Sequence, residues 1–199
     1  SDVYKRQIDA CATSYPSSVT APAGCSGAGE ADAGKELWAY IPNAVIPYLD
    51  QRISLSAFSH QYLMDSTPTT GDFCTGGTGT GNTGNCSSGW ESLLVASEGR
   101  GVSGIYALNI TNPQPSSAVA LDPWEITPST TGFSNMGYII ASPLLVKTQS
   151  MGWVVIFGSG YQPTSTSTGD GYIYFVNPKK GDLLPTVTLP NQVTGSQLS

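Results

Sequence analysis

The chain has 199 residues and a formal net charge of −6; only 11% of its residues are charged, whereas 23 are Gly and 14 are Pro. An acidic balance without clustered Lys and Arg excludes a nucleic-acid-binding surface, and no apolar run reaches the roughly 18 residues needed to span a bilayer. Gly, Pro, Ser and Thr interrupt short apolar runs throughout, which favours strands and turns over long helices. We therefore expect an all-β fold.

The segment 1–31 is polar and punctuated by Pro and Gly, which predicts an N-terminal loop. Its first residues, 1–7, join poorly to the polar segment after them, and we interpret them as an artefact of sequence assembly. Alternating apolar runs fill residues 32–195, the main domain that we expect. Residues 196–199 form a truncated end.

The stretch 34–42, GKELWAYIP, predicts a short strand that Pro42 stops. Residues 43–58 are the only part of the chain with some helical period, because Val45, Ile46 and Leu49 share one side. A short helix could form there.

Two sets of candidate strands occupy residues 60–127 and 137–190. The first set is HQYLMDS, WESLLVASEG, GIYALNITNP and ALDPWEIT, and the second is GYIIASPLLVKT, GWVVIFGSGY, GYIYFVNPKKG and LLPTVTLP. Turn residues separate the runs in both sets. The order strand, turn, strand, turn is therefore the same in the two halves.

The two sets repeat one four-stranded unit. Trp90 and Trp153 open the second strand of each set, and Tyr106–Asn109 matches Tyr174–Asn177. Tandem four-stranded units are typical of a β-propeller, in which a blade cannot bury its faces without neighbours. We predict about two and a half blades, the strand at 34–42 belonging to a preceding blade. A closed propeller needs at least four, so we expect the chain to be part of a larger protein.

The cysteines form two close pairs, Cys11 with Cys25 and Cys74 with Cys86. Zinc sites of the Cys-x-x-Cys kind have tighter spacing, and the single His60 is far from completing one. Two local disulfides are therefore the preferred interpretation. They imply an oxidising compartment.

No motif predicts catalysis or a metal site in this chain. Residues 79–84 spell G-x-G-x-x-G, but without the strand and helix that dinucleotide binding needs. Ser103 is not in a nucleophile elbow, and His60 has no visible orienting partner. Asp65 and Asp72 flank a Thr-Pro-Thr-Thr-Gly turn that they could cap.

The four tryptophans stand at strand starts or ends. In a propeller, tryptophans at repeated places usually pack one blade onto the next. We therefore interpret Trp38, Trp90, Trp124 and Trp153 as packing residues and not as a ligand platform.

The order of these segments from about residue 32 to 195 resembles the C-terminal, quinoprotein-like β-propeller of the PilC/PilY family, the type IV pilus tip-associated adhesins and assembly factors. The most specific matches are Asp65–Thr69, Gly104–Asn109 and Gly158–Tyr161. The matched blade positions are Gly99, Gly101, Gly104, Tyr106, Asn109, Gly158, Gly160, Trp90 and Trp153. Gly99, Gly101 and Gly104 correspond to the family's glycine-rich turn between the second and third strands of a blade.

The resemblance implies an extracellular, non-enzymatic domain at the pilus tip, associated with the outer membrane. Its implied partners are minor pilins and a host or abiotic surface. Family members often have Asp where this chain has Asn109 and Asn177, and a plainer loop where Cys74 to Cys86 is inserted. They commonly carry a calcium-binding loop shortly after the strand that ends near Leu189. Calcium is thus implied for the parent protein, and no cofactor is assigned to a residue present here.

Two other classes remain open from the sequence. Quinone-cofactor dehydrogenases share strands of the type seen at 31–38, although their adjacent cysteines, calcium ligands and catalytic Asp are not found here. A periplasmic assembly scaffold differs from a pilus-tip protein mainly in location.

Overall fold

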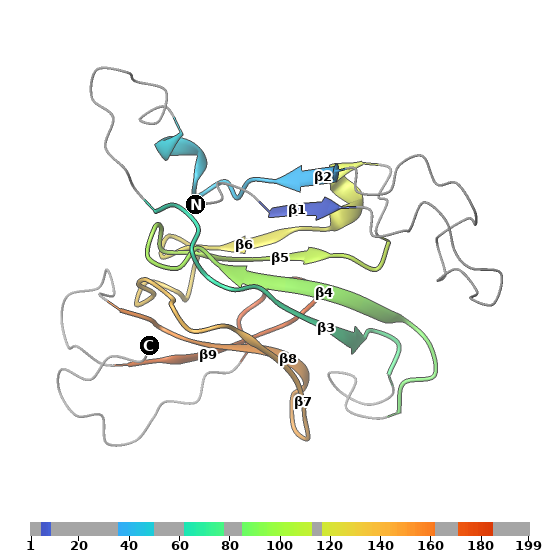
Figure 1. The fold of residues 1–199 in the computed structure, drawn as a ribbon. Helices are drawn as coiled ribbons and strands as arrows, with labels where there is room; N and C mark the ends of the chain where they lie inside the picture. Colours follow the sequence, from blue (N-terminus) through green and yellow to red (C-terminus); the bar gives the residue numbers. More distant parts are fainter. Residues whose placement is uncertain are drawn as a thin grey trace, which may run out of the picture. The chain divides into compact units, whose positions relative to one another are not determined.

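A computed structural model of the chain describes six stretches, shown in colour in Figure 1: residues 5–8, 36–49, 62–77, 85–112, 117–161 and 171–184. The predicted Cys11–Cys25 pair, His60 and the G-x-G-x-x-G segment at 79–84 lie outside these stretches. So does most of the strand expected over 183–190. The contacts divide the chain into two compact units, residues 4–41 and the remainder.

The first unit contains a two-stranded antiparallel sheet. Strand β1 (Lys5–Ile8) pairs with strand β2 (Glu36–Tyr40), with a register irregularity between Gln7 and Ile8. Strand β2 confirms the strand predicted at 34–42. The loop predicted over 1–31 is wrong at residues 5–8, because backbone pairing with β2 supplies a ladder that the polar sequence did not signal.

The second unit begins with a four-stranded antiparallel sheet in the order β3-β4-β5-β6. Its strands are β3 (Thr69–Cys74), β4 (Trp90–Ser97), β5 (Ile105–Asn109) and β6 (Trp124–Ile126). This is the simple up-and-down order of a propeller blade.

A second antiparallel sheet comes next, in the order β7-β8-β9 (Figure 1). Its strands are β7 (Leu144–Thr148), β8 (Gly152–Gly158) and β9 (Ile173–Val176). Leu183 forms a bridge to Val176, and the Leu184 N–H donates to the Phe175 carbonyl at 2.8 Å. These contacts place residues 183–184 beside β9 as an isolated bridge.

The first strand of each blade differs from the prediction. Residues 62–68 are irregular and not a strand, and β3 starts at Thr69, where the sequence indicated a turn. Gly71 weakens the strand pattern of β3, but its full ladder with β4, from Thr69↔Val95 to Cys74↔Trp90, overrides that weak propensity. In the second blade only 144–148 of the predicted strand 137–148 is regular, and Tyr138 makes a single bridge to Tyr161.

The helical elements of the described stretches are short 3-10 turns. Only Ile46–Tyr48 of the predicted helix 43–58 is helical among the described residues, as a 3-10 turn (η1) containing Pro47. A second 3-10 turn, η4 (Ala118–Leu121), occupies the start of the strand predicted at 120–127. Asp122, with φ 41°, ends η4, and the strand starts only after Pro123.

The sheet register confirms one repeat correspondence and corrects the other. Ser97 pairs with Ile105 and Gly158 pairs with Ile173, so Tyr106 and Tyr174 hold equivalent positions, as predicted. Counting back along β4 and β8 from Ser97 and Gly158, however, makes Met151 the counterpart of Trp90. The predicted Trp90–Trp153 correspondence is therefore two residues out of register. A shift of two preserves the in–out alternation, so the pattern alone could not detect it.

The hydrophobic core lies between the two sheets. Phe73, Leu93 and Val95 from the first sheet share one cluster with Val155 and Phe157 from the second. The connection between the sheets adds Phe133, Met136 and Ile139, each at most 1% exposed. The shared core is therefore buried by packing one blade against the other, as expected of neighbouring propeller blades.

Candidate functional site

Four features of the two blades contain the candidate residues: glycine-rich crossings, a lysine-centred polar cluster, a disulfide and a buried carboxyl group. Each is described from its local structure upward.

At each blade an incoming backbone segment passes directly over a glycine-rich turn. Residues 62–66 pass over the turn at 98–104, which we call the first crossing, and residues 137–138 pass over the turn at 159–161, which we call the second crossing. Gly99 and Gly160 hold equivalent places after β4 and β8, with φ +72° and +80°. A Cβ at Gly101 would collide with the backbone of Tyr62 and Leu63, and one at Gly160 with the backbone of Tyr138. The glycines are needed because another backbone passes directly over these turns.

The Asp65–Thr69 motif fixes the first crossing. The Asp65 N–H donates to the Glu98 carbonyl at 3.3 Å, and the Asp65 carboxylate accepts the Arg100 N–H at 2.7 Å. The Ser66 hydroxyl donates to the Ser97 carbonyl at 2.8 Å. In the second blade the Gly137 N–H donates to the Ser159 carbonyl at 2.7 Å, so the crossing is repeated there.

The two candidate carboxylates, Asp65 and Asp72, do not form a catalytic pair. Asp65 caps the turn after β4 by accepting the Arg100 N–H, whereas Asp72 on β3 accepts the Ser92 hydroxyl at 2.6 Å across the sheet. The predicted capping of one shared turn is therefore wrong, because the segment between them begins a strand. Ser103 lies in the β4–β5 turn, while the hydrogen bonds of the two acids go to other residues.

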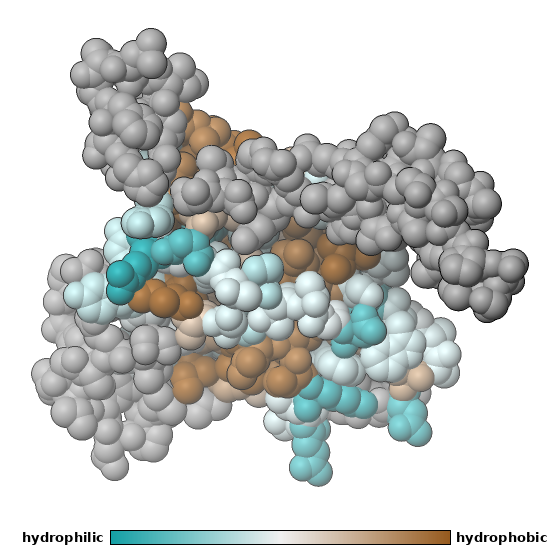
Figure 2. Space-filling view, in the orientation of Figure 1, coloured by the Kyte–Doolittle hydropathy of each residue, from teal (hydrophilic) through white to brown (hydrophobic). Residues whose placement is uncertain are grey.

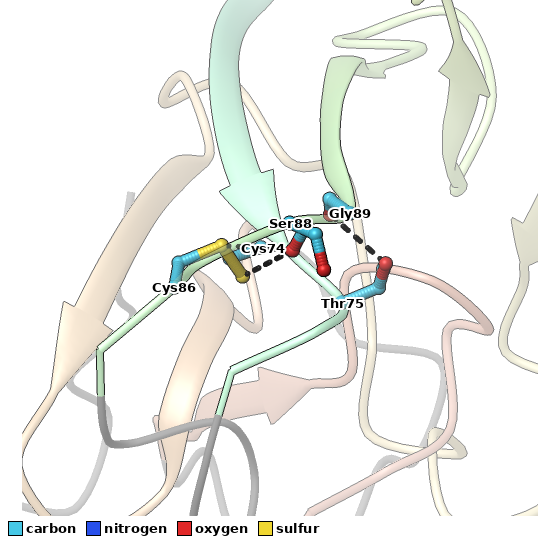
Figure 3. Close-up of a disulfide and its surroundings, with 5 residues drawn as sticks. All are labelled: Cys74, Thr75, Cys86, Ser88 and Gly89. Carbon is cyan, nitrogen blue, oxygen red and sulfur yellow. Dashed lines mark hydrogen bonds between the residues drawn. A yellow bond between two sulfur atoms is a disulfide. The ribbon is translucent and has the colours of Figure 1, made fainter.

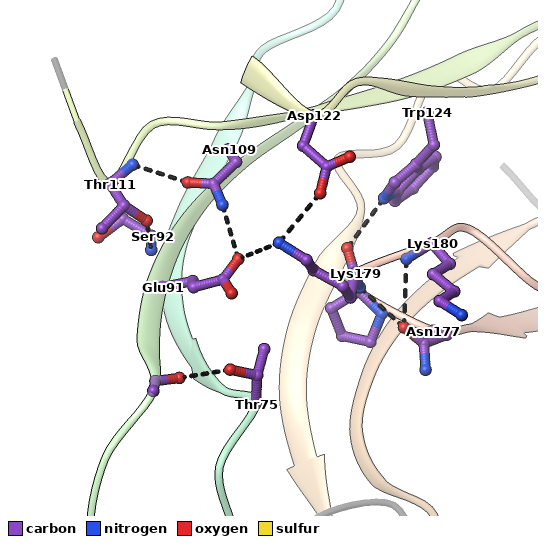
Figure 4. Close-up of polar contacts among 12 residues, drawn as sticks. Thr75, Glu91, Ser92, Asn109, Thr111, Asp122, Trp124, Asn177, Lys179 and Lys180 are labelled. Carbon is purple, nitrogen blue, oxygen red and sulfur yellow. Dashed lines mark hydrogen bonds and ion pairs between the residues drawn. The ribbon is translucent and has the colours of Figure 1, made fainter. Parts of the chain in front are cut away.

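A polar cluster centred on Lys179, which follows β9, links the second blade to β4 and to the end of η4 in the first blade (Figure 4). The Lys179 ammonium lies 2.7 Å from Glu91 Oε2 and 3.0 Å from Asp122 Oδ2. Asn109 Nδ2 donates to the same Glu91 oxygen at 2.6 Å. Partial burial acts to lower the pKa of Lys179, but the hydrogen bonds to Glu91 and Asp122 outweigh it and raise that pKa. Sequence reasoning missed this cluster, because its members are up to 88 residues apart.

The tryptophans at the seam between the two blades pack against the neighbouring blade, as predicted. Trp90 and Trp153 meet edge to face with ring centroids 5.9 Å apart. Trp124 on β6 donates its indole N–H to the Pro178 carbonyl at 2.9 Å (Figure 4). Trp38 belongs to the other unit.

The Cys74–Cys86 disulfide is confirmed and closes the loop between β3 and β4 (Figure 3). Both sulfur atoms lie near the Ser88 carbonyl oxygen, at 3.4 and 3.1 Å. The Thr75 hydroxyl and N–H both donate to the Gly89 carbonyl, at 2.9 and 2.8 Å. The base of the loop is thus fixed by one covalent bond and two hydrogen bonds.

A hollow of about 260 Å³ lies beside this loop, lined by Phe73, Thr75, Trp153 and Lys180 among others. It is smaller than the roughly 300–1,000 Å³ of most small-molecule sites. Lys179, also on its wall, is already paired with two acids. The small volume and the mixed apolar and cationic wall of the hollow point to no particular class of ligand.

Glu98, directly after β4, is a buried carboxyl group that sequence reasoning also missed. Its side chain is 1% exposed, and its Oε2 has no hydrogen-bond partner. Burial raises its pKa to about 8, against an opposing effect of its own backbone N–H and with a further rise from Glu125. Burial, followed by the charges of Glu98 and Glu125, also raises the pKa of Tyr106.

Among the described residues, no group of three or more His, Cys, Asp or Glu side chains is placed to hold a metal ion. None of the helices in these stretches is both long enough and apolar enough to cross a membrane.

The blade order, the shared core and the paired crossings define an all-β protein of the β-propeller class. The fold is similar to the crystal structure of the Pseudomonas aeruginosa PilY1 C-terminal domain, with a TM-score of 0.55 and 22% sequence identity, covering 82% of this chain and 27% of that one. No family model matches the chain.

Sequence relatives confirm the resemblance to the PilC/PilY family. A type IV pilus biogenesis factor PilY1 homolog from Xylella fastidiosa is 31% identical over 142 residues, or 69% of this chain. The type IV pilus biogenesis factor PilY1 of Pseudomonas aeruginosa strain UCBPP-PA14 is 28% identical over 161 residues, or 80% of this chain. The chain is thus a homologue of PilY1 proteins, and it spans 10% and 12% of the lengths of these two relatives.

Proposed function

We propose that this chain is a pair of blades, with part of a third, from the propeller of a type IV pilus biogenesis factor. The observation that carries the proposal is the similarity to Pseudomonas aeruginosa PilY1 over 80% of the chain. The structure is compatible with such a scaffold: the polar groups brought together at the seam are used to join blades. Lys179, for example, is held by Glu91 and Asp122.

We further propose a non-enzymatic domain that acts outside the cell, at the pilus tip. The disulfide Cys74–Cys86 supports an oxidising compartment. Minor pilins and a host or abiotic surface are the proposed partners. Calcium binding is proposed for the parent protein.

Deletion of the parent gene is expected to reduce the number of surface pili, counted after shearing or by electron microscopy. A finer test replaces Gly101 by Leu in the parent gene, because a side chain there collides with the Tyr62 backbone. Val119→Ala is the matched control, since Val119 is 83% exposed. Normal piliation in the deletion strain would contradict a part in pilus biogenesis.

Adhesion needs its own measurement, because loss of pili alone reduces attachment. Surface attachment is therefore compared between strains that carry equal numbers of pili. An attachment defect at equal piliation supports adhesion, and its absence limits the protein to assembly.

The rival classes are separated by two direct assays. A quinone-cofactor dehydrogenase would reduce a dye after reconstitution with quinone and calcium, and we expect no reduction above the level of protein without quinone. Protease added to intact cells is expected to cleave the parent protein, whereas a periplasmic scaffold would be protected.

A further inference from the structure

The first crossing differs from the second in one buried group. Glu98 and Ser159 hold equivalent positions, and both are 1% exposed. The Ser159 hydroxyl accepts the Tyr172 N–H at 3.1 Å, so the polar atom of that side chain has a partner. The Glu98 Oε2 has none. The turn itself thus does not require a carboxyl group, and an unsatisfied buried oxygen calls for another explanation.

The backbone of Glu98 carries the first crossing. Its N–H donates to the Gly104 carbonyl at 3.1 Å, which closes the β4–β5 turn. Its carbonyl accepts the Asp65 N–H at 3.3 Å, which holds the incoming segment of residues 62–66. This segment also buries Leu63 and Met64, at 2% and 3% exposure.

Water cannot reach the Glu98 carboxyl group while the crossing is closed. Gly104 lies so close that a Cβ there would stand 2.5 Å from Glu98 Oε2. Hydration of an ionised carboxylate therefore requires the turn at 98–104 to move, and the segment 62–66 is bonded to that turn through the Asp65 N–H. Ionising a buried carboxyl group without hydration or a counter-charge is strongly unfavourable.

The groups that face Glu98 make ionisation harder still. Glu125 of β6 and Tyr106 of β5 lie on its side of the sheet, since Tyr106 pairs with Glu125 across the ladder. On the incoming segment, the Asp65 carboxylate binds the Arg100 N–H. Both ion pairs among the described residues are made by Lys179, so neither supplies a counter-charge to Glu98.

We propose that a proton on Glu98 holds the segment 62–66 closed over the first blade, and that this crossing opens progressively as the pH rises from acidic to mildly alkaline. The crossing over the second blade, which has Ser159 in place of the acid, stays closed over the same range. The first crossing is in this way a pH-dependent latch between one blade and the chain that leads into it.

The pH window is set by linkage. In the closed state the pKa of Glu98 is about 8, whereas its ordinary value is 4.5. The stabilisation of the closed state is complete below the lower value and is lost as the pH rises through the higher one. Between pH 4.5 and about 8, the fraction of molecules with the first crossing open grows by up to about tenfold per pH unit. Above about pH 8 this fraction levels off.

Hydrogen exchange of the parent protein between pH 5 and 9 tests the latch. Exchange rates of residues 62–66 and 98–104 are divided by those of residues 134–138 and 158–161, after correction for intrinsic rates, so that the second crossing serves as an internal control. The ratio is expected to rise with pH and to level off near 8. In Glu98→Gln, which keeps the shape but cannot ionise, the ratio should be independent of pH.

Two further variants keep the proposal falsifiable if Glu98→Gln does not fold. Glu98→Ser copies the second blade and should also abolish the pH dependence. Glu125→Gln removes a neighbouring negative charge, so the rise should level off at a lower pH. A constant ratio in the unmodified protein, or the same rise in a folded Glu98 variant, overturns the proposal.

Discussion

Asn109 and Asn177 end the third strands of two successive blades in the same way. The side-chain oxygen of Asn109 accepts the Thr111 N–H at 3.0 Å, and that of Asn177 accepts the Lys179 N–H at 2.8 Å. Each residue therefore makes an Asx turn to the residue two places on. Their surroundings differ, because Asn109 also donates to Glu91, whereas Asn177 accepts a second bond from the Lys180 N–H at 3.2 Å.

This difference predicts opposite responses to the same substitution. Asn109→Asp retains the turn but replaces the donor to Glu91 by a second negative charge, and should lower the free energy of unfolding by about 1–3 kcal/mol. Asn177→Asp keeps an oxygen that only accepts, next to two lysines, and should leave it within about 0.5 kcal/mol. Urea denaturation of both variants at pH 7 measures the contrast. Equal losses would mean that the Asn109–Glu91 bond is unimportant.

Gly101→Ala should be far more harmful than Gly71→Ala. A methyl group at Gly101 meets the fixed backbone of Tyr62 and Leu63, whereas at Gly71 it meets the end of the Leu145 side chain at 3.2 Å. We expect a loss of roughly 2–4 kcal/mol at Gly101 and of about 1 kcal/mol or less at Gly71. Thermal unfolding of the two proteins compares them, and similar melting temperatures would contradict the close crossing.

Trp124→Phe should destabilise the seam more than Trp90→Phe. Trp124 is 8% exposed and loses its hydrogen bond to the Pro178 carbonyl, which predicts a cost of about 1–3 kcal/mol. Trp90 is 52% exposed, and its ring contact with Trp153 is retained by Phe. Chemical denaturation followed by circular dichroism is the measurement. A larger effect at Trp90 would place the stabilising contact elsewhere.

Replacing Cys74 and Cys86 together by Ala should loosen one loop and leave the blades folded. The loss is expected to be on the order of 3 kcal/mol, from the greater freedom of the unfolded chain. Far-ultraviolet circular dichroism should be unchanged while protease cleavage between the two positions accelerates. Mass spectrometry of unreduced peptides tests both predicted pairs, and a crossed pairing or free thiols would contradict the Cys11–Cys25 assignment.

Residues 1–199 expressed alone should associate. The face of the second blade that points away from the shared core carries partly exposed Ile156 and Phe175, and Leu144 is 57% exposed. Figure 2 shows hydrophobic surface over β8 and β9. Uncovered apolar sheet faces favour association. Size-exclusion chromatography should therefore give oligomers, and a stable monomer of 20.8 kDa would contradict the prediction of an incomplete propeller.

The sequence was most informative where a pattern is local. Apolar runs between turn residues located β4, β5 and β8, and the spacing of Cys74 and Cys86 predicted their disulfide. β3 was missed because Gly71 and polar Thr and Asp residues fill a strand whose stability comes from its ladder with β4. A ladder with a distant partner is not encoded in a short window.

The polar partners of Lys179 and the buried surroundings of Glu98 could not be predicted from the sequence for the same reason. Nothing near Lys179 in the sequence indicates Glu91 or Asp122, and nothing near Glu98 indicates that the backbone of Gly104 will exclude water from it. The first environment arises where separate blades meet, and the second where the strands and the turn of one blade fold together. The glycines were correctly singled out, because a close backbone approach restricts the residue type itself.

The links between the blades also determine how the pair would respond to mechanical load. Thr69 donates its hydroxyl to the Pro143 carbonyl at 2.7 Å at one end of the seam, and Lys179 binds Glu91 at 2.7 Å at the other. The core lies between these two attachments. Pulling the blades apart therefore loads both ends together instead of opening the seam from one side, and rupture becomes a single cooperative event. A domain that transmits tension would resist up to a threshold force and then separate abruptly.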